Sequence, residues 1–174
     1  MEHKILFTGT MGAGKTTAIA AISEIEPISS DVRNSDKSCN KASTTVGLDY
    51  GEVTLDNGDK LRLYGSPGQQ RFDFMWRILA KGALGVVILI DNSRPDPLAD
   101  LDIYLAGFAE LIAQTGCVVG VGRMATHAVP DIDAFAARMN ARGVVCPVLP
   151  VDVRESEQVL ELLDLLLIQL ESSH

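Results

Sequence analysis

The clearest chemical motif lies near the start of the chain, in the run Gly9-Thr10-Met11-Gly12-Ala13-Gly14-Lys15-Thr16. It matches G-x-x-x-x-G-K-[ST], and it follows an apolar run and opens a helical one, as this motif requires. Its glycines allow consecutive backbone N–H groups to curl around an anion, and the helix N-terminus adds a partial positive charge. Lys15 is placed to reach β- and γ-phosphates, and the Thr16 hydroxyl to ligate Mg²⁺. The motif predicts a nucleoside polyphosphate site that includes Gly9, Met11, Gly12, Ala13, Gly14, Lys15, Thr16 and Thr17.

Composition limits the class of protein. The 174 residues predict a single domain over 1–174, and 47% hydrophobic residues with 22% charged ones are typical of a globular fold. The formal charge is −8, which argues against a nucleic acid or an anionic membrane as partner. We therefore expect a bound phosphate to be held by directed backbone dipoles and a few chosen cations.

The cysteines and the N-terminus indicate the compartment. Cys39, Cys117 and Cys146 are spaced for neither a zinc site nor a redox dithiol. The N-terminal Met1-Glu2-His3-Lys4 has neither a signal-peptide nor a myristoylation pattern, and the apolar runs are shorter than a membrane span. We expect a cytoplasmic protein with reduced cysteines and no membrane anchor.

The order of apolar and polar segments predicts the fold class. The Asn57-Gly58 pair favours a hairpin turn between two strands, and Pro147 suits an edge strand. The polar segment 28–45 has no periodicity and is expected to be a long functional loop. We predict an α/β, three-layer fold whose six-stranded sheet is mostly parallel with one antiparallel strand. The expected strands are 4–8, 48–55, 60–64, 84–91, 117–121 and 144–151, and the expected helices are 15–24, 72–81, 100–113, 131–140 and 156–170.

Two further segments resemble the switches of the small-GTPase superfamily. The first is Thr44-Thr45-Val46-Gly47, and the second is Tyr64-Gly65-Ser66-Pro67-Gly68-Gln69-Gln70-Arg71-Phe72. The resemblance implies that Thr45 ligates Mg²⁺ and contacts the γ-phosphate, and that Gly68 offers its N–H to the same phosphate. It also implies that Gln69 orients the attacking water.

The second segment is most similar to one subgroup, the MglA-like bacterial small GTPases and the conservon-type ATP/GTP-binding proteins. The similarity continues through the helical residues 74–77 and Gly82-Ala83 to the apolar strand ending at Asp91. It implies a P-loop NTPase fold of the small-GTPase kind, which binds GTP or GDP with Mg²⁺. It also implies a protein partner, of the roadblock type in this subgroup.

The sequence departs from this pattern at two places. Gly65 stands where the family has an aspartate that holds a Mg²⁺-bound water, and Asp49 and Asp91 are the candidates to replace it. In the run 120–127, Ala125 stands where a guanine-binding acid is expected, so the base, guanine or adenine, stays open. Arg123 is a candidate to lie over the base, or else a solvated cation, and Asp152 is a candidate to approach the base from the other side.

Three functions fit these features. The first is a nucleotide-dependent switch with slow hydrolysis, in which the γ-phosphate tethers Thr45 and Gly68. The second is a nucleotide-binding scaffold without hydrolysis, which Gly65 and the missing base-recognition acid favour. The third is a small P-loop kinase, although no arginine-rich lid segment is apparent. Phe72, Phe74 and Trp76 are expected to be core residues, with a partner surface as the alternative.

Overall fold

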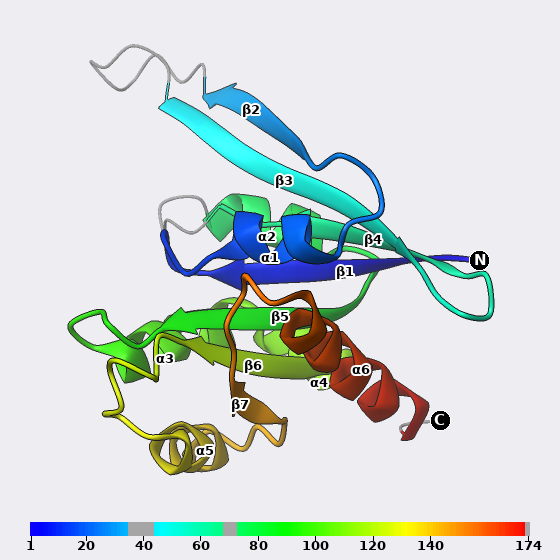
Figure 1. Ribbon diagram of the computed structural model, residues 1–174. Helices are drawn as coiled ribbons and strands as arrows, with labels where there is room; N and C mark the ends of the chain where they lie inside the picture. Colours follow the sequence, from blue (N-terminus) through cyan, green and yellow to red (C-terminus); the bar gives the residue numbers. More distant parts are fainter. Residues whose placement is uncertain (35–43, 68–72, 173–174) are drawn as a thin grey trace.

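The computed structural model describes residues 1–34, 44–67 and 73–172, and these residues form a seven-stranded sheet in the order β2-β3-β4-β1-β5-β6-β7 (Figure 1). The strands are β1 (Glu2–Gly9), β2 (Ile28–Asn34), β3 (Thr44–Thr54), β4 (Lys60–Gly65), β5 (Ala83–Asp91), β6 (Cys117–Gly122) and β7 (Val148–Pro150). The helices are α1 (Lys15–Ile22), α2 (Asp73–Ala80), α3 (Pro97–Gly107), α4 (Ala109–Gln114), α5 (Ile132–Ala141) and α6 (Ser156–Ser172).

The predicted fold class is confirmed. β1 pairs in parallel with β4 and β5, and β5, β6 and β7 continue the parallel sheet. β3 pairs antiparallel with both β2 and β4, so it is the strand that runs against the others. The carboxyl ends of β1 and β5 therefore lie at the same edge of the sheet, where functional loops of such folds gather.

The sheet has seven strands and not the expected six, because the N-terminal part of the expected loop 28–45 forms β2. Residues 28–34 pair antiparallel with residues 44–50 of β3 at the edge of the sheet. An edge strand is held largely by backbone hydrogen bonds, so it needs no buried apolar alternation. The polar sequence of this segment consequently gave no strand signal. Residues 35–43 lie outside the described part of the chain.

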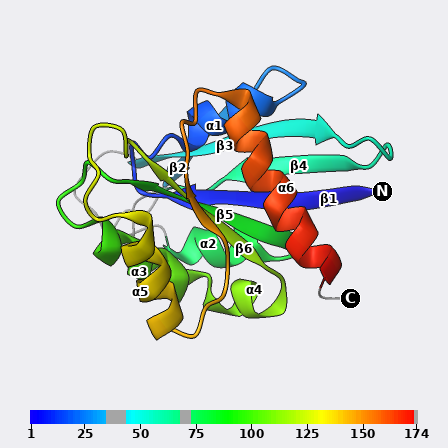
Figure 2. The ribbon, with the colours of Figure 1, turned by 60° about the horizontal axis from the view of Figure 1, so that its bottom comes forward.

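Helices cover both faces of the sheet (Figure 2). Two layers of apolar side chains hold them against it. Side chains of α1 and α6, including Ile19 and Leu162, pack on one face with Phe7 of β1. Side chains of α2, α3, α4 and α5 pack on the other face, around residues such as Trp76 and Phe135. Because both faces are covered, the central strands β1, β5 and β6 each contain an uninterrupted run of apolar or small residues, and this pattern made them predictable.

The helix expected over 100–113 is divided into α3 and α4 at Phe108. The preceding residue is Gly107, and a Cβ there would lie 2.6 Å from the ring of Trp76. Trp76 is 2% exposed and stacks on Phe108, with ring centroids 5.2 Å apart. Glycine at position 107 leaves room for the Trp76 ring, but glycine also weakens a helix. The helix is therefore interrupted where Trp76 packs against it.

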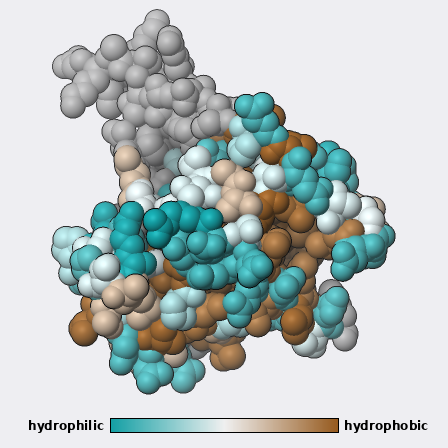
Figure 3. Space-filling view, in the orientation of Figure 1, coloured by the Kyte–Doolittle hydropathy of each residue, from teal (hydrophilic) through white to brown (hydrophobic). Residues whose placement is uncertain are grey.

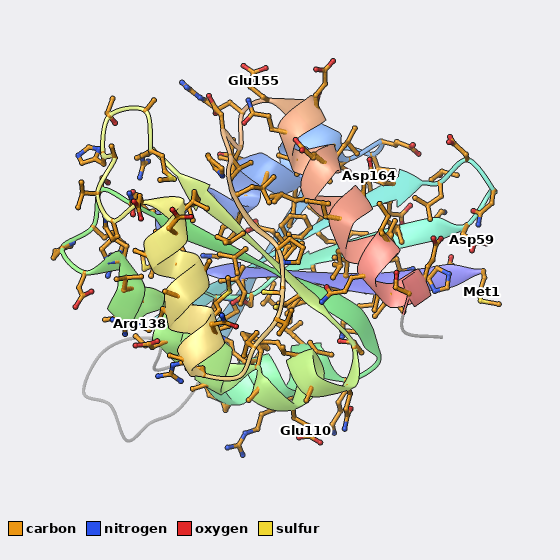
Figure 4. All side chains as sticks on the ribbon, turned by 90° about the horizontal axis from the view of Figure 1, so that it is seen from below. Met1, Asp59, Glu110, Arg138, Glu155 and Asp164 are labelled. Carbon is orange, nitrogen blue, oxygen red and sulfur yellow. The ribbon has the colours of Figure 1, made fainter. Side chains whose placement is uncertain are left out.

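The last strand is also shorter than expected. β7 covers only Val148–Pro150 and not 144–151, although it does lie at the sheet edge as Pro147 indicated. The hairpin turn is confirmed, with Gly58 at φ 89° and the Leu55 N–H donating to the Asp59 carbonyl at 2.7 Å. At this end of the sheet the Met1 ammonium donates to Asp59 Oδ1 at 3.2 Å (Figure 4). This contact ties the start of β1 to the hairpin, away from the phosphate loop.

The surface seen from the side of α1 and α6 mixes hydrophilic and hydrophobic residues (Figure 3). Over the described residues, none of the helices has both the length and the apolar character needed to cross a bilayer. Three aromatic residues at positions 72, 74 and 76 were expected to be core residues. Trp76 is one, whereas Phe74 is 51% exposed and Phe72 lies outside the described residues.

Candidate functional site

The phosphate loop connects the carboxyl end of β1 to the N-terminus of α1, at the edge of the sheet where β1 and β5 end (Figure 1). Gly9, Gly12 and Gly14 all have positive φ, of 148°, 80° and 95°. A Cβ at Gly9 would lie 2.1 Å from the carbonyl oxygen of Leu89 on β5, and one at Gly14 would lie 2.6 Å from the Val153 side chain. The loop conformation therefore depends on glycine at these positions.

Lys15 is the buried cation of this loop. Its side chain is 8% exposed, and its Nζ donates to the Gly9 carbonyl at 2.7 Å and to the Thr10 carbonyl at 2.9 Å. Burial lowers the pKa of Lys15 to about 8, and the negative charge of Asp49 opposes this effect. A buried ammonium held by two neutral carbonyl oxygens is stabilised by a nearby anion, such as a phosphate.

A cleft of about 840 Å³ opens beside Lys15, and this volume is typical of a small-molecule site. Three segments line most of it, namely 12–17, 121–126 and 150–154, with Asp91 and Gln158 between them. These segments come from the phosphate loop, the end of β6 and the loop after β7. The fold thus brings together three predicted regions that are distant in the sequence.

Most of the predicted binding residues line this cleft: Gly12, Ala13, Gly14, Lys15, Thr16, Thr17, Arg123 and Asp152. Met11 is 60% exposed and does not line it, and Gly9 lies at the base of the loop against β5. The backbone of Thr45 lies at the start of β3. Gly68 and Gln69 lie outside the described residues.

The chain leading to Gly68 is anchored beside the phosphate loop. The Ser66 hydroxyl donates to Thr8 Oγ1 at 2.7 Å, and the Ser66 N–H donates to the Phe7 carbonyl of β1 at 2.8 Å. The indole N–H of the buried Trp76 donates to the Pro67 carbonyl at 2.9 Å. The last described residues before Gly68 are therefore fixed next to the carboxyl end of β1.

Arg123 joins the phosphate loop to the end of β5. It has φ 62°, and its Nη1 donates to an oxygen of Asp91 and, at 3.5 Å, to the Gly12 carbonyl. The other oxygen of Asp91 accepts hydrogen bonds from the backbone and hydroxyl of Ser93, at 2.9 and 2.6 Å. Burial by itself would raise the pKa of Asp91, but these hydrogen bonds and the charge of Arg123 hold it below its usual value. Both oxygens of Asp91 are thus engaged by protein groups.

Asp152 also lines the cleft, and Arg154 holds its carboxylate. Arg154 donates through Nε and Nη2 to the two carboxylate oxygens, at 3.0 and 2.9 Å. These hydrogen bonds lower the pKa of Asp152 to about 2. The Asp152 N–H donates to the Gln158 side chain at 2.7 Å. The carboxylate that was expected to approach the base is therefore already paired with an arginine.

Three residues that sequence reasoning missed support this end of the cleft. Asn92 donates to the carbonyls of His127 and Pro130, at 2.6 and 3.0 Å, and so holds the loop after β6. Gln158 holds the loop after β7, and Val153 packs where a Cβ of Gly14 would lie. Only Asn92 had a usable signal, since it directly follows a buried strand at the carboxyl edge of a parallel sheet.

Two oxygen-bearing side chains near the loop suit Mg²⁺. The Thr16 hydroxyl donates to Asp49 Oδ2 at 2.7 Å, so a hydroxyl and a carboxylate lie together at the start of α1. The described residues contain no group of three or more His, Cys, Asp or Glu side chains that could hold a metal ion. Mg²⁺ typically uses one or two protein groups together with water and substrate phosphates, so this pair fits its requirements.

The fold and this site define a P-loop NTPase. The phosphate loop joins the first strand of a mostly parallel sheet to a helix, its lysine is buried under the loop, and a nucleotide-sized cleft opens beside it.

Comparison with known proteins agrees with this class. A family model described as a conserved hypothetical ATP binding protein matches residues 26–109, slightly less than half of the chain. An uncharacterized protein of Methanocaldococcus jannaschii is 29% identical over 97 residues, which are 53% of each chain. The GTP-binding protein ypt4 of Schizosaccharomyces pombe is 26% identical over 126 residues, 68% of this chain and 49% of the relative. The Ras-related protein Rab-12 of Mus musculus is 25% identical over 119 residues, 63% of this chain and 44% of the relative.

The chain spans about half the length of these curated relatives. The likeness to ypt4 and Rab-12 relates the chain to Ras-like GTPases at low identity. It is therefore a nucleotide-binding protein with distant Ras-like GTPase relatives.

Proposed function

We propose that this protein is a cytoplasmic nucleotide-dependent switch of the MglA-like or conservon-type group. It binds GTP with Mg²⁺, hydrolyses it slowly, and signals to a protein partner of the roadblock type. The observation that carries the proposal is the buried Lys15 ammonium, held by the Gly9 and Thr10 carbonyls beside an open cleft. In this proposal the phosphate loop and Lys15 bind the triphosphate, and Mg²⁺ neutralises charge on its β- and γ-phosphates.

The switch itself consists of two segments that a γ-phosphate would order. Thr45 lies at the start of β3 and is proposed as a Mg²⁺ ligand together with Thr16. Gly68 is proposed to donate its N–H to the γ-phosphate, and Gln69 to orient the attacking water. The anchoring of Ser66 to Thr8 supports this, because the second segment then starts beside the phosphate loop. Loss of the γ-phosphate would release both segments and change the partner surface.

Limited proteolysis tests the switch. We expect cleavage within residues 35–43 and 68–72 to be slower with a non-hydrolysable GTP analogue and Mg²⁺ than with GDP and Mg²⁺. In single-turnover phosphate release, Gln69→Leu is expected to be at least about tenfold slower than the wild type. Gln70→Leu is the matched control, since it removes the neighbouring amide.

A protein that binds both nucleotides with identical protease sensitivity would contradict the switch. Equal phosphate release by the wild type and Gln69→Leu would favour the second candidate, a nucleotide-binding scaffold without catalysis. One observation favours this alternative, namely that Gly65, at the carboxyl end of β4, carries no carboxylate.

The choice of base gives a separate prediction. Ala125 lines the cleft where a guanine-binding acid is expected, and Asp91 and Asp152 are engaged by arginines. We expect the wild type to prefer GTP over ATP by less than about tenfold, and Ala125→Asp to raise this preference about 10- to 100-fold. Competition binding against a fluorescent nucleotide measures both ratios.

Ala128→Asp is the matched control for this change. Ala128 is exposed, lies three residues further along the same loop and does not line the cleft. The Ala128→Asp variant adds the same negative charge, but outside the cleft where the nucleobase would bind. An equal shift in both variants would show that the effect is general electrostatics and not base recognition.

A further inference from the structure

Two cysteines that are distant in the sequence are neighbours at the edge of the sheet. Cys117 begins β6, and Cys146 lies just before β7. The two strands pair in parallel with Val119 opposite Val148, and the Val119 N–H donates to the Pro147 carbonyl at 2.9 Å. Each cysteine lies two residues before this pair, so the register places Cys117 and Cys146 opposite each other.

The side chains of both cysteines lie on the same face of the sheet. Cys117 belongs to the apolar layer that holds α5 against the sheet, and Cys146 packs against the same layer. The next residue of β6, Val118, faces the other layer, as the alternation of side chains along a strand requires. Neighbouring strands are about 4.8 Å apart, and disulfide-bonded residues have Cα atoms about 4.4–6.8 Å apart. The backbone therefore permits a bond between the two sulfur atoms without a large movement.

The two thiols are in contact and differ in their exposure. Cys117 is fully buried, whereas Cys146 is partly buried. The Cys117 thiol donates to the Cys146 sulfur, and the Cys146 thiol donates to the Met139 sulfur of α5 at 3.4 Å. The hydrogen bond from Cys117 lowers the pKa of Cys146 and, together with burial, raises the pKa of Cys117. Cys146 is thus the more acidic and the more accessible thiol, and both properties favour its oxidation.

We propose that Cys117 and Cys146 form a reversible disulfide in response to hydrogen peroxide. The Cys146 thiolate attacks one peroxide oxygen and the O–O bond breaks, which leaves a sulfenic acid on Cys146 and a hydroxide that takes up the thiol proton. The Cys117 sulfur then attacks the Cys146 sulfur, and the hydroxyl group leaves with the Cys117 proton as water. Two thiols are oxidised to one disulfide, and one peroxide is reduced to two molecules of water. A dithiol reductant reverses the reaction by thiol–disulfide exchange.

This thiol pair is separate from the phosphate loop. β6 runs from Cys117 to Gly122, and only its carboxyl end lines the cleft. The cysteines lie at the opposite end, where the bond would tie the short edge strand β7 to β6. The cross-link does not depend on nucleotide binding, so its test uses the protein without added nucleotide.

The test treats the full chain with a small molar excess of hydrogen peroxide and maps cross-linked peptides by mass spectrometry. We expect a 117–146 cross-link in most molecules and its complete reversal by dithiothreitol. The bond should raise the midpoint temperature of thermal unfolding by at least about 4 °C, because it constrains the unfolded chain. Cys39→Ala is the matched control, since it removes the third cysteine and should leave both the cross-link and the temperature shift unchanged.

Single variants separate the roles of the two sulfur atoms. In Cys117→Ala the Cys146 sulfenic acid should persist and react with dimedone, whereas Cys146→Ala should leave Cys117 unmodified under the same treatment. A folded wild type that forms no 117–146 cross-link, or that forms cross-links to Cys39 instead, would overturn the proposal. A 117–146 cross-link that lowers the unfolding temperature would also overturn it, because the bond would then be incompatible with the native strand pairing.

Discussion

Lys15→Ala is expected to lower the affinity for a nucleoside triphosphate with Mg²⁺ by about 100-fold or more. The lysine is buried, and its ammonium is held at the base of the loop by the Gly9 and Thr10 carbonyls. Charge-assisted hydrogen bonds to phosphate contribute about 1.5–3 kcal/mol each, and about 1.4 kcal/mol corresponds to a tenfold change. Isothermal titration calorimetry measures the effect.

Lys81→Ala is the control for this experiment, because Lys81 is an exposed lysine of similar charge that does not line the cleft. The affinity of Lys81→Ala for the nucleoside triphosphate should stay within about twofold of the wild type, as expected for loss of an exposed, screened charge. Thermal unfolding without nucleotide should confirm that Lys15→Ala still folds. A folded Lys15→Ala protein with wild-type affinity would contradict the phosphate-binding role of the loop.

Gly9→Ala is expected to lower the free energy of unfolding by about 3–5 kcal/mol, one of the largest effects of a single methyl group in this chain. The added Cβ would lie 2.1 Å from the Leu89 carbonyl oxygen and 3.1 Å from its carbon, so β1 and β5 would have to separate. Both are central strands that pair with each other along residues 4–9. Urea unfolding without added nucleotide measures the loss.

Gly58→Ala separates this steric effect from the cost of a positive φ. Gly58 has φ 89° in the hairpin turn, but a Cβ there would have nothing within 4 Å. Alanine in such a conformation costs about 1 kcal/mol. If the two variants lost the same stability, the close approach of Gly9 to β5 would carry no energetic weight.

The elements that the sequence predicted best are those whose signal is local. The strands around 4–8, 84–91 and 117–121 contain uninterrupted runs of apolar or small residues because helices cover both faces of the sheet. β2 was missed for the opposite reason, since its polar residues pair at the sheet edge without an apolar pattern. The break at Phe108 was missed because it follows from the packing of Trp76, which lies about thirty residues away.

The residues of the site were likewise predictable only where their signal is local. The eight residues of the phosphate loop are consecutive, so their types and spacing alone predicted a phosphate site at the end of the first strand. Which acids face that site was beyond the sequence. The contacts of Thr16 with Asp49 and of Arg123 with Asp91 join residues that are 33 and 32 positions apart.

The sequence by itself therefore determined the phosphate loop and the α/β fold class, because each depends on short-range spacing and on the burial of continuous apolar runs. Only the tertiary structure decided how the three acids are used. It placed Asp49 against Thr16, paired Asp91 with Arg123 and paired Asp152 with Arg154. The physical reason is that strand register and the meeting of strand ends set which charges come within hydrogen-bonding distance, and no local pattern encodes that register.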